Sequence, residues 1–326
     1  MIISRTPYRM SFFGGGTDYN PYFEKYGGSV ISVTINKYCY VTLRHLPPFF
    51  GHKYQIKWSC VEGVNRIEDI KHPSVRACLK YLEEDNISLT HDGDLPARSG
   101  LGSSSSFTVG MLNALHALRG EYVSAEKLAR EAIHVEQDIL HENVGVQDQI
   151  AAAYGGFNRI HFSRDGIDVR PIIISSRRKH ELDSNIMLFF TGLQRTASEI
   201  AQEQVDSIKK NLTKLHRIQE LTEKAAQLLQ SDKSLCEFGL LLDEMWNLKR
   251  GLTSNISNNR VDDIYDRAKK AGAIGGKLMG AGGGGFIFFY VEQDSQEAVR
   301  QALKDLLYVP FEFETGGSKI VFYSEG

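Results

Sequence analysis

Apolar and polar residues alternate in the early part of the chain and follow a helical period further on. Ile31, Val33 and Ile35 alternate with polar residues, which is the period of a half-buried strand. A second β-rich run follows at 38–43, and a short strand is expected near 54–58. Apolar residues spaced by three or four predict helices in four places: after Pro73, from Ser104 to about 118, over about 124–140, and from Val146 to Gly155.

The second half of the chain repeats this mixture of strands and helices. Strand patterns occur at 157–162, 169–174, 186–190 and 286–291, with two short β runs near the end. Helical patterns occur at about 197–230, 235–250, 262–271 and 294–307. The polar, basic stretch 175–179 indicates a domain boundary near residue 180. We therefore predict an α+β protein with an N-terminal domain over 1–180 and a C-terminal domain over 181–326.

Composition narrows the function classes. The 326 residues carry 38 Lys and Arg against 40 Asp and Glu, a formal net charge of -2, which argues against nucleic acid or an anionic membrane as the main partner. No apolar run approaches the roughly 20 residues needed to span a bilayer. The four cysteines lack C-x-x-C spacing, so no zinc ribbon or disulfide scaffold is indicated. We expect a cytoplasmic protein, and the sequence leaves open whether it forms a homodimer.

The first of three glycine-rich segments covers residues 13–19. Three consecutive glycines, 14–16, allow a ligand to approach the backbone or allow positive φ angles. Thr17 and Asp18 add a hydroxyl and a carboxylate, which suit the hydroxyl groups of a sugar. A plain glycine-rich turn with Asp18 capping a helix is the alternative.

The second segment, residues 96–107, runs directly into a predicted helix. Small residues there expose successive backbone N–H groups, and the helix start adds partial positive charge. Together they favour an anion site suited to phosphates, while serine hydroxyls could reach a magnesium ion. The alternative is a serine-rich N-cap on an ordinary core helix.

The third segment, residues 275–286, formally contains G-x-G-x-x-G from Gly280 to Gly285. The dinucleotide fingerprint follows a strand and opens a helix, whereas this loop is expected to follow a helix and precede a strand. No segment contains the G-K-[ST] of a Walker A box. A third type of phosphate loop is therefore needed.

In order and spacing, the three segments resemble the signature motifs of the GHMP kinases, a family of galactokinases, homoserine kinases, mevalonate kinases and phosphomevalonate kinases. The resemblance covers nearly the whole chain. Residues 13–19, 144–149 and 190–198 resemble the sugar-kinase branch, above all its kinases of heptose 7-phosphate. The resemblance implies a GHMP kinase fold, with an N-terminal domain like ribosomal protein S5 domain 2, a ferredoxin-like C-terminal domain, and an active site between them.

The resemblance also implies roles for single residues. Asp148 would orient or deprotonate the attacking hydroxyl, and Arg9 would stabilise the transferring charge. Ser104 and Glu136 would hold magnesium, with Glu142 or Asp138 as alternatives to Glu136. The implied ATP contacts are Pro96, Ser99, Gly100, Leu101, Gly102, Ser103, Ser104 and Ser105. The implied sugar contacts are Gly15, Gly16, Thr17, Asp18, Gly282 and Gly283.

We therefore expect a kinase that uses ATP and Mg²⁺ to phosphorylate the anomeric hydroxyl of a phosphorylated heptose. Thr196 and Glu199 fit a capping box, so Arg195 beside that helix start is predicted to bind the distal phosphate of the sugar. By position alone, the loops within 46–73 are expected to pack on the adenine. Two alternatives stay open: a 1-kinase for an unphosphorylated sugar such as fucose, and a catalytically silent sugar sensor.

Overall fold

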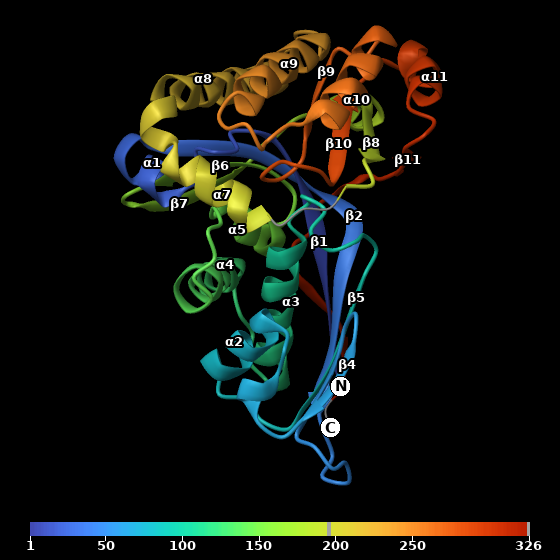
Figure 1. Ribbon diagram of the computed structural model, residues 1–326. Helices are drawn as coiled ribbons and strands as arrows, with labels where there is room; N and C mark the ends of the chain where they lie inside the picture. Colours follow the sequence, from blue (N-terminus) through green and yellow to red (C-terminus); the bar gives the residue numbers. More distant parts are fainter. Residues whose placement is uncertain (194–196, 325–326) are drawn as a thin grey trace.

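The computed structural model describes residues 1–193 and 197–324, except the side chains of residues 197 and 198. It has two lobes, with the first strands and helices α2 to α4 in one, and helices α8 to α11 in the other (Figure 1). The amino group of Met1 donates to the carbonyl of Ser324 at 2.7 Å, so the two ends of the described chain lie together.

Within the described residues, nine strands form the first sheet. Its central path runs β13-β1-β2-β5-β3-β4, and β12 and β6 also pair with β2. The strands are β1 (Ile2–Phe13), β2 (Gly28–His45), β3 (Tyr54–Lys57), β4 (Val61–Val64), β5 (Ile87–Gly93), β6 (Phe157–Ser163), β7 (Gly166–Pro171), β12 (Phe313–Glu314) and β13 (Lys319–Tyr323).

The second sheet has four strands among the described residues, in the order β11-β8-β10-β9, all antiparallel. They are β8 (Ile186–Phe190), β9 (Gly275–Leu278), β10 (Phe286–Tyr290) and β11 (Leu307–Tyr308). Helices separate β8 from β9 and β10 from β11, which gives the βαββαβ order of a ferredoxin-like fold. The predicted α+β class and ferredoxin-like C-terminal part are therefore confirmed.

Helices cover these sheets (Figure 1). The N-terminal ones are α1 (Asn20–Tyr26), η1 (Ile67–Asp69), α2 (Pro73–Tyr81), α3 (Ser103–Leu118), α4 (Ala125–Ile133), the π-helical η2 (His134–Ile139) and α5 (Gln147–Tyr154). The later ones are α6 (Ser176–Ser184), α7 (Ala197–Asp206), η3 (Ile208–Asn211), α8 (Leu212–Leu229), α9 (Cys236–Arg250), α10 (Asn259–Lys270) and α11 (Gln293–Ala302).

Several predicted elements were wrong in extent. The two β runs at 31–35 and 38–43 belong to one continuous strand, β2. The helix predicted over 197–230 is broken between α7 and α8, where the Asn211 side chain donates to the carbonyls of Ser207 and Leu252. The polar stretch 175–179 lies largely in α6, which Ser175 caps through the N–H of Arg178.

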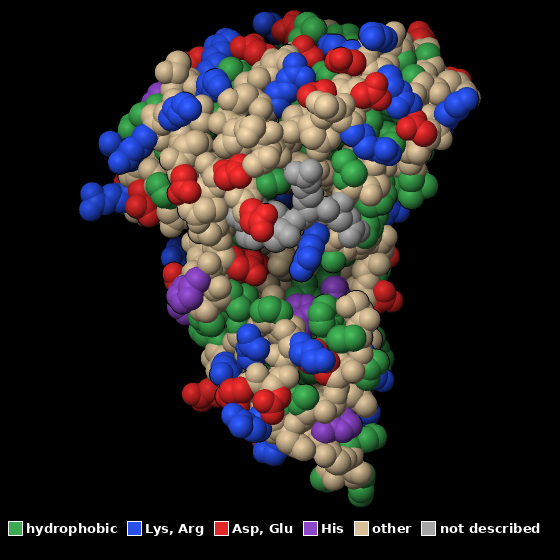
Figure 2. Space-filling model, viewed as in Figure 1, with side chains coloured by type: hydrophobic (Ala, Val, Ile, Leu, Met, Phe, Trp, Pro, Cys, Tyr) green, Lys and Arg blue, Asp and Glu red, His purple; other side chains and the backbone are tan. Residues whose placement is uncertain are grey.

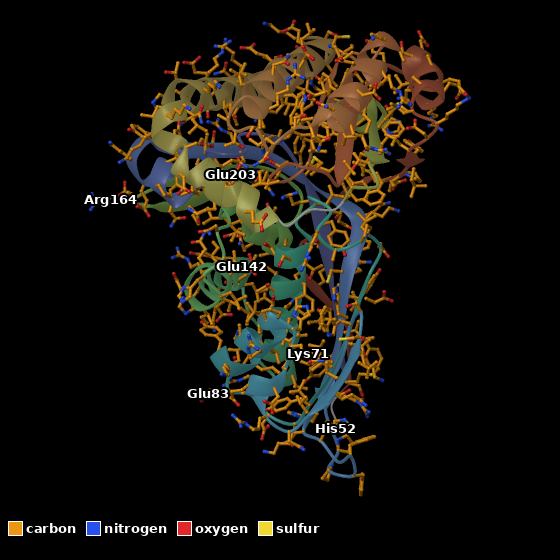
Figure 3. All side chains as sticks on the ribbon, viewed as in Figure 1. His52, Lys71, Glu83, Glu142, Arg164 and Glu203 are labelled. Carbon is orange, nitrogen blue, oxygen red and sulfur yellow. The ribbon has the colours of Figure 1, made fainter. Side chains whose placement is uncertain are left out.

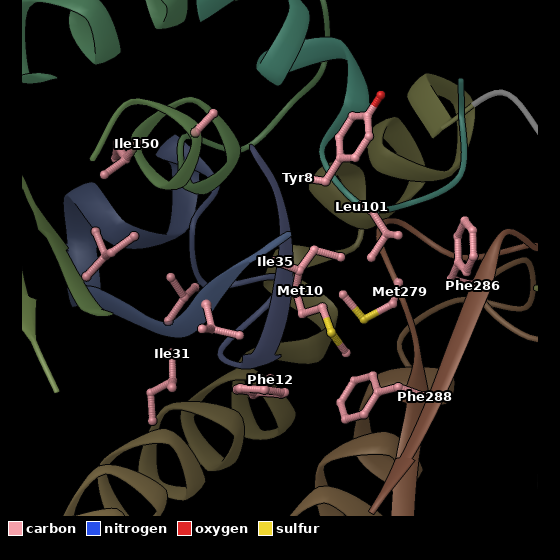
Figure 4. Close-up of a cluster of buried hydrophobic side chains, with 14 of the residues drawn as sticks. Tyr8, Met10, Phe12, Ile31, Ile35, Leu101, Ile150, Met279, Phe286 and Phe288 are labelled. Carbon is pink, nitrogen blue, oxygen red and sulfur yellow. The ribbon is translucent and has the colours of Figure 1, made fainter. Parts of the chain in front are cut away.

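One continuous hydrophobic core joins the two lobes. Figure 4 shows Phe12 of β1 close to Phe288 of β10, and their ring centroids are 5.5 Å apart in an edge arrangement. Met10 and Met279 are fully buried beside them. Because the lobes share this apolar contact, the loops at the lobe boundary are held in fixed positions.

The visible surface mixes acidic and basic side chains without a large patch of one sign (Figure 2). This agrees with the near-zero net charge of the sequence. Among the described residues, no helix is long and apolar enough to cross a membrane.

A buried histidine links the end of α3 to α4. The His116 side chain is 3% exposed, with Nδ1 2.9 Å from Glu121 Oε2 and Nε2 2.7 Å from Glu131 Oε2. Both ring nitrogens face carboxylates, so both must donate, which requires the charged imidazolium. These contacts, above all the hydrogen bond with Glu131, raise the pKa of His116.

The raised pKa makes stability depend on pH. The stabilisation is complete below the ordinary histidine pKa of about 6.5 and is lost as pH rises through the higher folded-state pKa. We expect His116→Gln to lower the free energy of unfolding by about 1.5–3 kcal/mol at pH 6, because bonds to charged groups are lost. Urea unfolding at pH 6 and pH 9 should show the difference from wild type shrinking at pH 9.

His134→Gln is the matched control, because His134 pairs with Asp138 on the exposed face of the same region. Such surface pairs contribute little, so this variant should match wild type at both pH values. A His116→Gln deficit that is the same at pH 6 and pH 9 would contradict the charged-imidazolium interpretation.

Candidate active site

Arg9 ties three chain segments together at the lobe boundary. Its Nε and Nη2 donate to the two carboxylate oxygens of Asp148 at 2.7 and 2.6 Å. Its Nη1 donates to the carbonyl of Gly100 at 2.7 Å, and its backbone N–H donates to the carbonyl of Leu101 at 3.0 Å. The arginine is 2% exposed. Its buried guanidinium therefore connects strand β1 to α5, through a bidentate pair, and to the second glycine-rich segment.

The second segment contains the start of α3. Gly100 and Gly102 have φ angles of +84° and +77°, which glycine adopts without strain. Gly102 is the N-cap of the 16-residue α3 and supplies no side-chain cap to its N–H groups. These uncapped N–H groups and the positive end of the helix dipole are the features of a phosphate site. The predicted helix start is confirmed, and phosphate binding there stays a prediction.

The third glycine-rich segment packs against the second. An added Cβ at Gly100 would lie 2.5 Å from the carbonyl oxygen of Met279, and one at Gly285 would lie 2.3 Å from that of Ser99. The Phe286 N–H also donates to the Ser99 carbonyl at 3.1 Å. The glycine loop of this segment, residues 279–285, follows strand β9, so the expectation that the loop follows a helix was wrong. The loop still fails the dinucleotide fingerprint because it leads into strand β10 and not into a helix.

A pocket opens between these loops and gathers many of the predicted residues. Those lining it are Arg9, Gly16, Asp18, Gly100, Gly102, Ser103, Ser104, Ser105, Asp148 and Gly282. Other predicted residues do not line this pocket: Pro96, Ser99, Leu101, Gly15, Thr17, Glu136 and Gly283. Leu101 is buried in the core, and the Thr17 hydroxyl donates to the Gly14 carbonyl at 2.8 Å, so neither side chain faces the cleft.

Asp18 lies on the floor of this pocket with both oxygens bonded inside the protein. Its Oδ1 accepts from the Gly16 N–H at 2.9 Å, and its Oδ2 accepts from Gln147 Nε2 at 2.8 Å. A Cβ at Gly145 would lie 2.0 Å from Asp18 Oδ2, so this approach requires glycine. Burial raises the pKa of Asp18, although these hydrogen bonds oppose the rise.

Glu136 has the features of a cation ligand. It is 1% exposed on η2, its Oε2 accepts from Ser105 Oγ at 2.9 Å and from Gln149, and its Oε1 is buried without a partner. Burial raises the pKa of Glu136 to about 7, with the nearby Glu142 charge adding to the effect. Glu136 is therefore not a solvated helix position.

The other acidic candidates lie on the same stretch of chain. Glu142 is half-buried, its N–H donates to the Glu136 carbonyl at 2.9 Å, and it lies near α4, below α7 (Figure 3). Asp138 is exposed and pairs with His134, and it does not line the pocket. The described residues contain no cluster of three or more His, Cys, Asp or Glu able to hold a metal alone. A magnesium ion held here would therefore need serine oxygens and nucleotide phosphates as further ligands.

Comparison with known proteins agrees with this geometry. Residues 73–156 match the GHMP kinases N terminal domain, and residues 196–309 match the GHMP kinases C terminal domain. The chain is 31% identical over 98% of both chains to D-glycero-alpha-D-manno-heptose 7-phosphate kinase of Campylobacter jejuni.

The chain belongs to the GHMP kinase family. Like other family members it is a phosphotransferase, and its similarity to the heptose 7-phosphate kinase shows that it is a sugar kinase. A solved D-glycero-D-manno-heptose 1-phosphate kinase from Bacteroides thetaiotaomicron superposes with a TM-score of 0.79 at 26% identity, covering 100% of both chains. A putative sugar kinase structure from Campylobacter jejuni gives 0.71 at 28% identity, covering 98% of this chain and 97% of that one.

The motifs of this GHMP kinase did not point to every polar residue of the pocket. Lys249 of α9 and Gln204 of α7 line it, and neither belongs to a glycine-rich segment. One signal for Lys249 was available: it continues the apolar stripe of Phe238, Leu242 and Met245 at helical spacing. A lysine in such a stripe must be buried, and buried charges are rare without a partner.

The predicted phosphate ligand Arg195 lies outside the described residues. Thr196 of the proposed capping box lies there too. The described part of α7 begins at Ala197, and its first turn carries Glu199. The contact between Arg195 and a distal phosphate therefore stays a prediction.

Glu136→Gln is expected to raise the Mg²⁺ concentration needed for half-maximal activity by about tenfold or more, a typical effect of losing a metal-site group. The variant keeps the side-chain shape but removes the free carboxylate oxygen. Titrating Mg²⁺ at saturating ATP and sugar, and measuring Mg²⁺-dependent ATP binding without sugar, checks this.

Asp138→Asn serves as control, because it removes an exposed carboxylate two positions along the same segment. It should leave the Mg²⁺ requirement unchanged. If Glu142→Gln has the large effect and Glu136→Gln has little, Glu142 is the ligand and the assignment of Glu136 is wrong.

Proposed function

We propose that this chain phosphorylates the anomeric hydroxyl of D-glycero-D-manno-heptose 7-phosphate with ATP and Mg²⁺, giving the 1,7-bisphosphate. The observation that carries the proposal is the Asp148 carboxylate, held by Arg9 in the pocket beside the start of α3. The similarity to the Campylobacter heptose 7-phosphate kinase over nearly the whole chain supports this acceptor. Residues 1–180 would carry the nucleotide, and 181–326 would close the cleft.

The nucleotide phosphates fit the loop that begins α3. The free N–H groups after Gly102 would bind phosphate oxygens, and the hydroxyls of Ser104 and Ser105 lie on the first turn. Glu136 Oε1, which is buried without a partner, together with these hydroxyls would hold the cation. A magnesium ion held by these groups would supply positive charge that offsets the negative charge of the phosphates.

An aromatic cluster next to this loop suits the adenine ring. The His72 ring lies 4.9 Å from Trp58 and 4.8 Å from Phe107, and His91 lies 4.6 Å from Phe107, between ring centroids. Phe107 stands one turn into α3, and burial lowers the pKa of His72 to about 4. Neutral, flat side chains of this kind stack on a purine. Trp58 and His72 come from the 46–73 region expected to pack on adenine.

In the transfer step, the acceptor hydroxyl oxygen bonds to the γ-phosphorus while the bond from that phosphorus to the ADP oxygen breaks. The hydroxyl proton passes to Asp148, and ADP leaves with the electron pair. The two hydrogen bonds from Arg9 fix the position of the Asp148 carboxylate. Asp148 would therefore act mainly by holding the hydroxyl in line.

A second acceptor is favoured by a separate observation. The chain is 27% identical to the L-fucokinase/L-fucose-1-P guanylyltransferase of Bacteroides fragilis over 92% of this chain and 35% of that protein. A 1-kinase for an unphosphorylated sugar is therefore the alternative, and it predicts that the distal phosphate adds nothing to the rate.

An assay coupled to ADP production with a panel of sugars tests the proposal. We expect kcat/KM for the heptose 7-phosphate to exceed that for the unphosphorylated heptose, fucose and galactose by about tenfold or more, since charge-assisted bonds to a phosphate contribute roughly 1.5–3 kcal/mol. Phosphorus NMR of the product should show a second phosphate coupled to the anomeric proton.

Asp148→Asn is the control that assigns the turnover to this site, and it should lower kcat by at least about a hundredfold, as is usual for a catalytic proton acceptor. A higher kcat/KM for an unphosphorylated sugar would favour the fucokinase-like alternative. Sugar binding with no ADP production above the Asp148→Asn level would leave only the sensor alternative.

A further inference from the structure

Lys249 is a buried charge in the pocket that the proposed transfer step does not use. It is 5% exposed in the last turn of α9, and its Nζ donates to the Gly280 carbonyl at 3.1 Å. Among the described residues, that carbonyl is its only hydrogen-bond partner. An ammonium group has three N–H groups, so two have no partner within the described residues, and Lys249 lines the pocket.

The first glycine-rich segment passes directly over this ammonium. A Cβ at Gly15 would lie only 2.9 Å from Lys249 Nζ, so a larger residue there would displace the ammonium. Asp18, from the same segment, also lines the pocket, and its charge opposes the lowering of the Lys249 pKa by burial. The Lys249 ammonium, a hydrogen-bond donor from α9, and the Asp18 carboxylate, an acceptor from the first segment, therefore belong to residues that line the same pocket.

The surrounding charges indicate which chemical group the ammonium suits. Besides Asp18, the charged groups that act on Lys249 are Arg9, Asp148 and Lys277. Arg9 is already paired with Asp148, and Lys277 donates to the Ser11 carbonyl at 2.8 Å. A phosphate dianion bound at Lys249 would face the carboxylates of Asp18 and Asp148. A sugar hydroxyl avoids this repulsion, because it can accept from a cation and donate to a carboxylate.

We propose that Lys249 binds the acceptor sugar, with Nζ donating to a ring hydroxyl next to the one that donates to Asp18. Lys249 and Asp18 together would select sugars in which two neighbouring hydroxyls have the right relative configuration. This inference rests on the proposed function only in needing a sugar in this pocket, whichever sugar that is. It also gives a reason for glycine at position 15, because a Cβ there would displace the ammonium.

Lys249→Met and Lys249→Arg test the proposal with the sugar of highest kcat/KM in the panel. Lys249→Met should raise the KM for that sugar by about tenfold or more, as for a lost charge-assisted bond, and Lys249→Arg should recover part of the loss. The KM for ATP should change by less than about twofold, because the phosphate loop keeps its own contacts.

Lys214→Met is the matched control, since Lys214 donates to the Gly251 carbonyl outside the pocket. It should leave both KM values unchanged. If Lys249→Met raises the KM for ATP and for sugar alike and lowers the thermal midpoint, Lys249 only tethers the Gly280 loop, and the proposal is overturned.

Monodeoxy analogues of the same sugar identify the hydroxyl. For the analogue that lacks the hydroxyl bound by Lys249, wild type and Lys249→Met should have nearly equal kcat/KM, because the ammonium has no hydroxyl left to bind. An equal penalty from Lys249→Met on every analogue would overturn the proposal. If the preferred sugar is not the heptose 7-phosphate, the proposed acceptor is wrong, and the Lys249 comparison still decides this inference on the preferred sugar.

Discussion

The site depends on one buried arginine. Arg9 is almost fully removed from water, and an unpaired guanidinium there would be strongly destabilising. Its pairing with Asp148 and its bond to the Gly100 carbonyl satisfy the group. The same contacts fix the distance between the carboxylate and the phosphate loop. The contacts that allow the charged Arg9 side chain to be buried are therefore the same contacts that would align an acceptor hydroxyl with a phosphate.

Contacts between the two lobes then hold this arrangement in place. The loops that carry Gly100 and Gly285 lie so close together that neither position has room for a Cβ. Phe12 packs on Phe288 across the boundary, and Lys277 of β9 donates to a carbonyl of β1. The third glycine-rich segment thus acts mainly by shape, because it lets the C-terminal lobe touch the phosphate loop. It also lines the pocket, through Met279, Gly280, Ala281, Gly282 and Gly284.

Features that depend on neighbouring residues in the chain could be predicted from the sequence, whereas features that depend on contacts between distant segments could not. The loop before α3 was found because small residues before a helical pattern suffice to indicate it. The Thr17 side chain was misplaced because only the packed turn shows that its hydroxyl bonds back to Gly14. Lys249 was missed because its helix had to be placed against the first segment before its role could be considered. The break between α7 and α8 depends on Asn211 reaching Leu252, a contact that periodicity does not contain.

A double-mutant cycle on Arg9 and Asp148 tests this account most directly. If one shared pair sets the alignment, Arg9→Met and Asp148→Asn should each lower kcat/KM strongly. The double variant should then be within about threefold of the worse single variant, a coupling of well over 1 kcal/mol. Losses that multiply in the double variant would show that the two residues act independently, and would contradict the central role of their pairing.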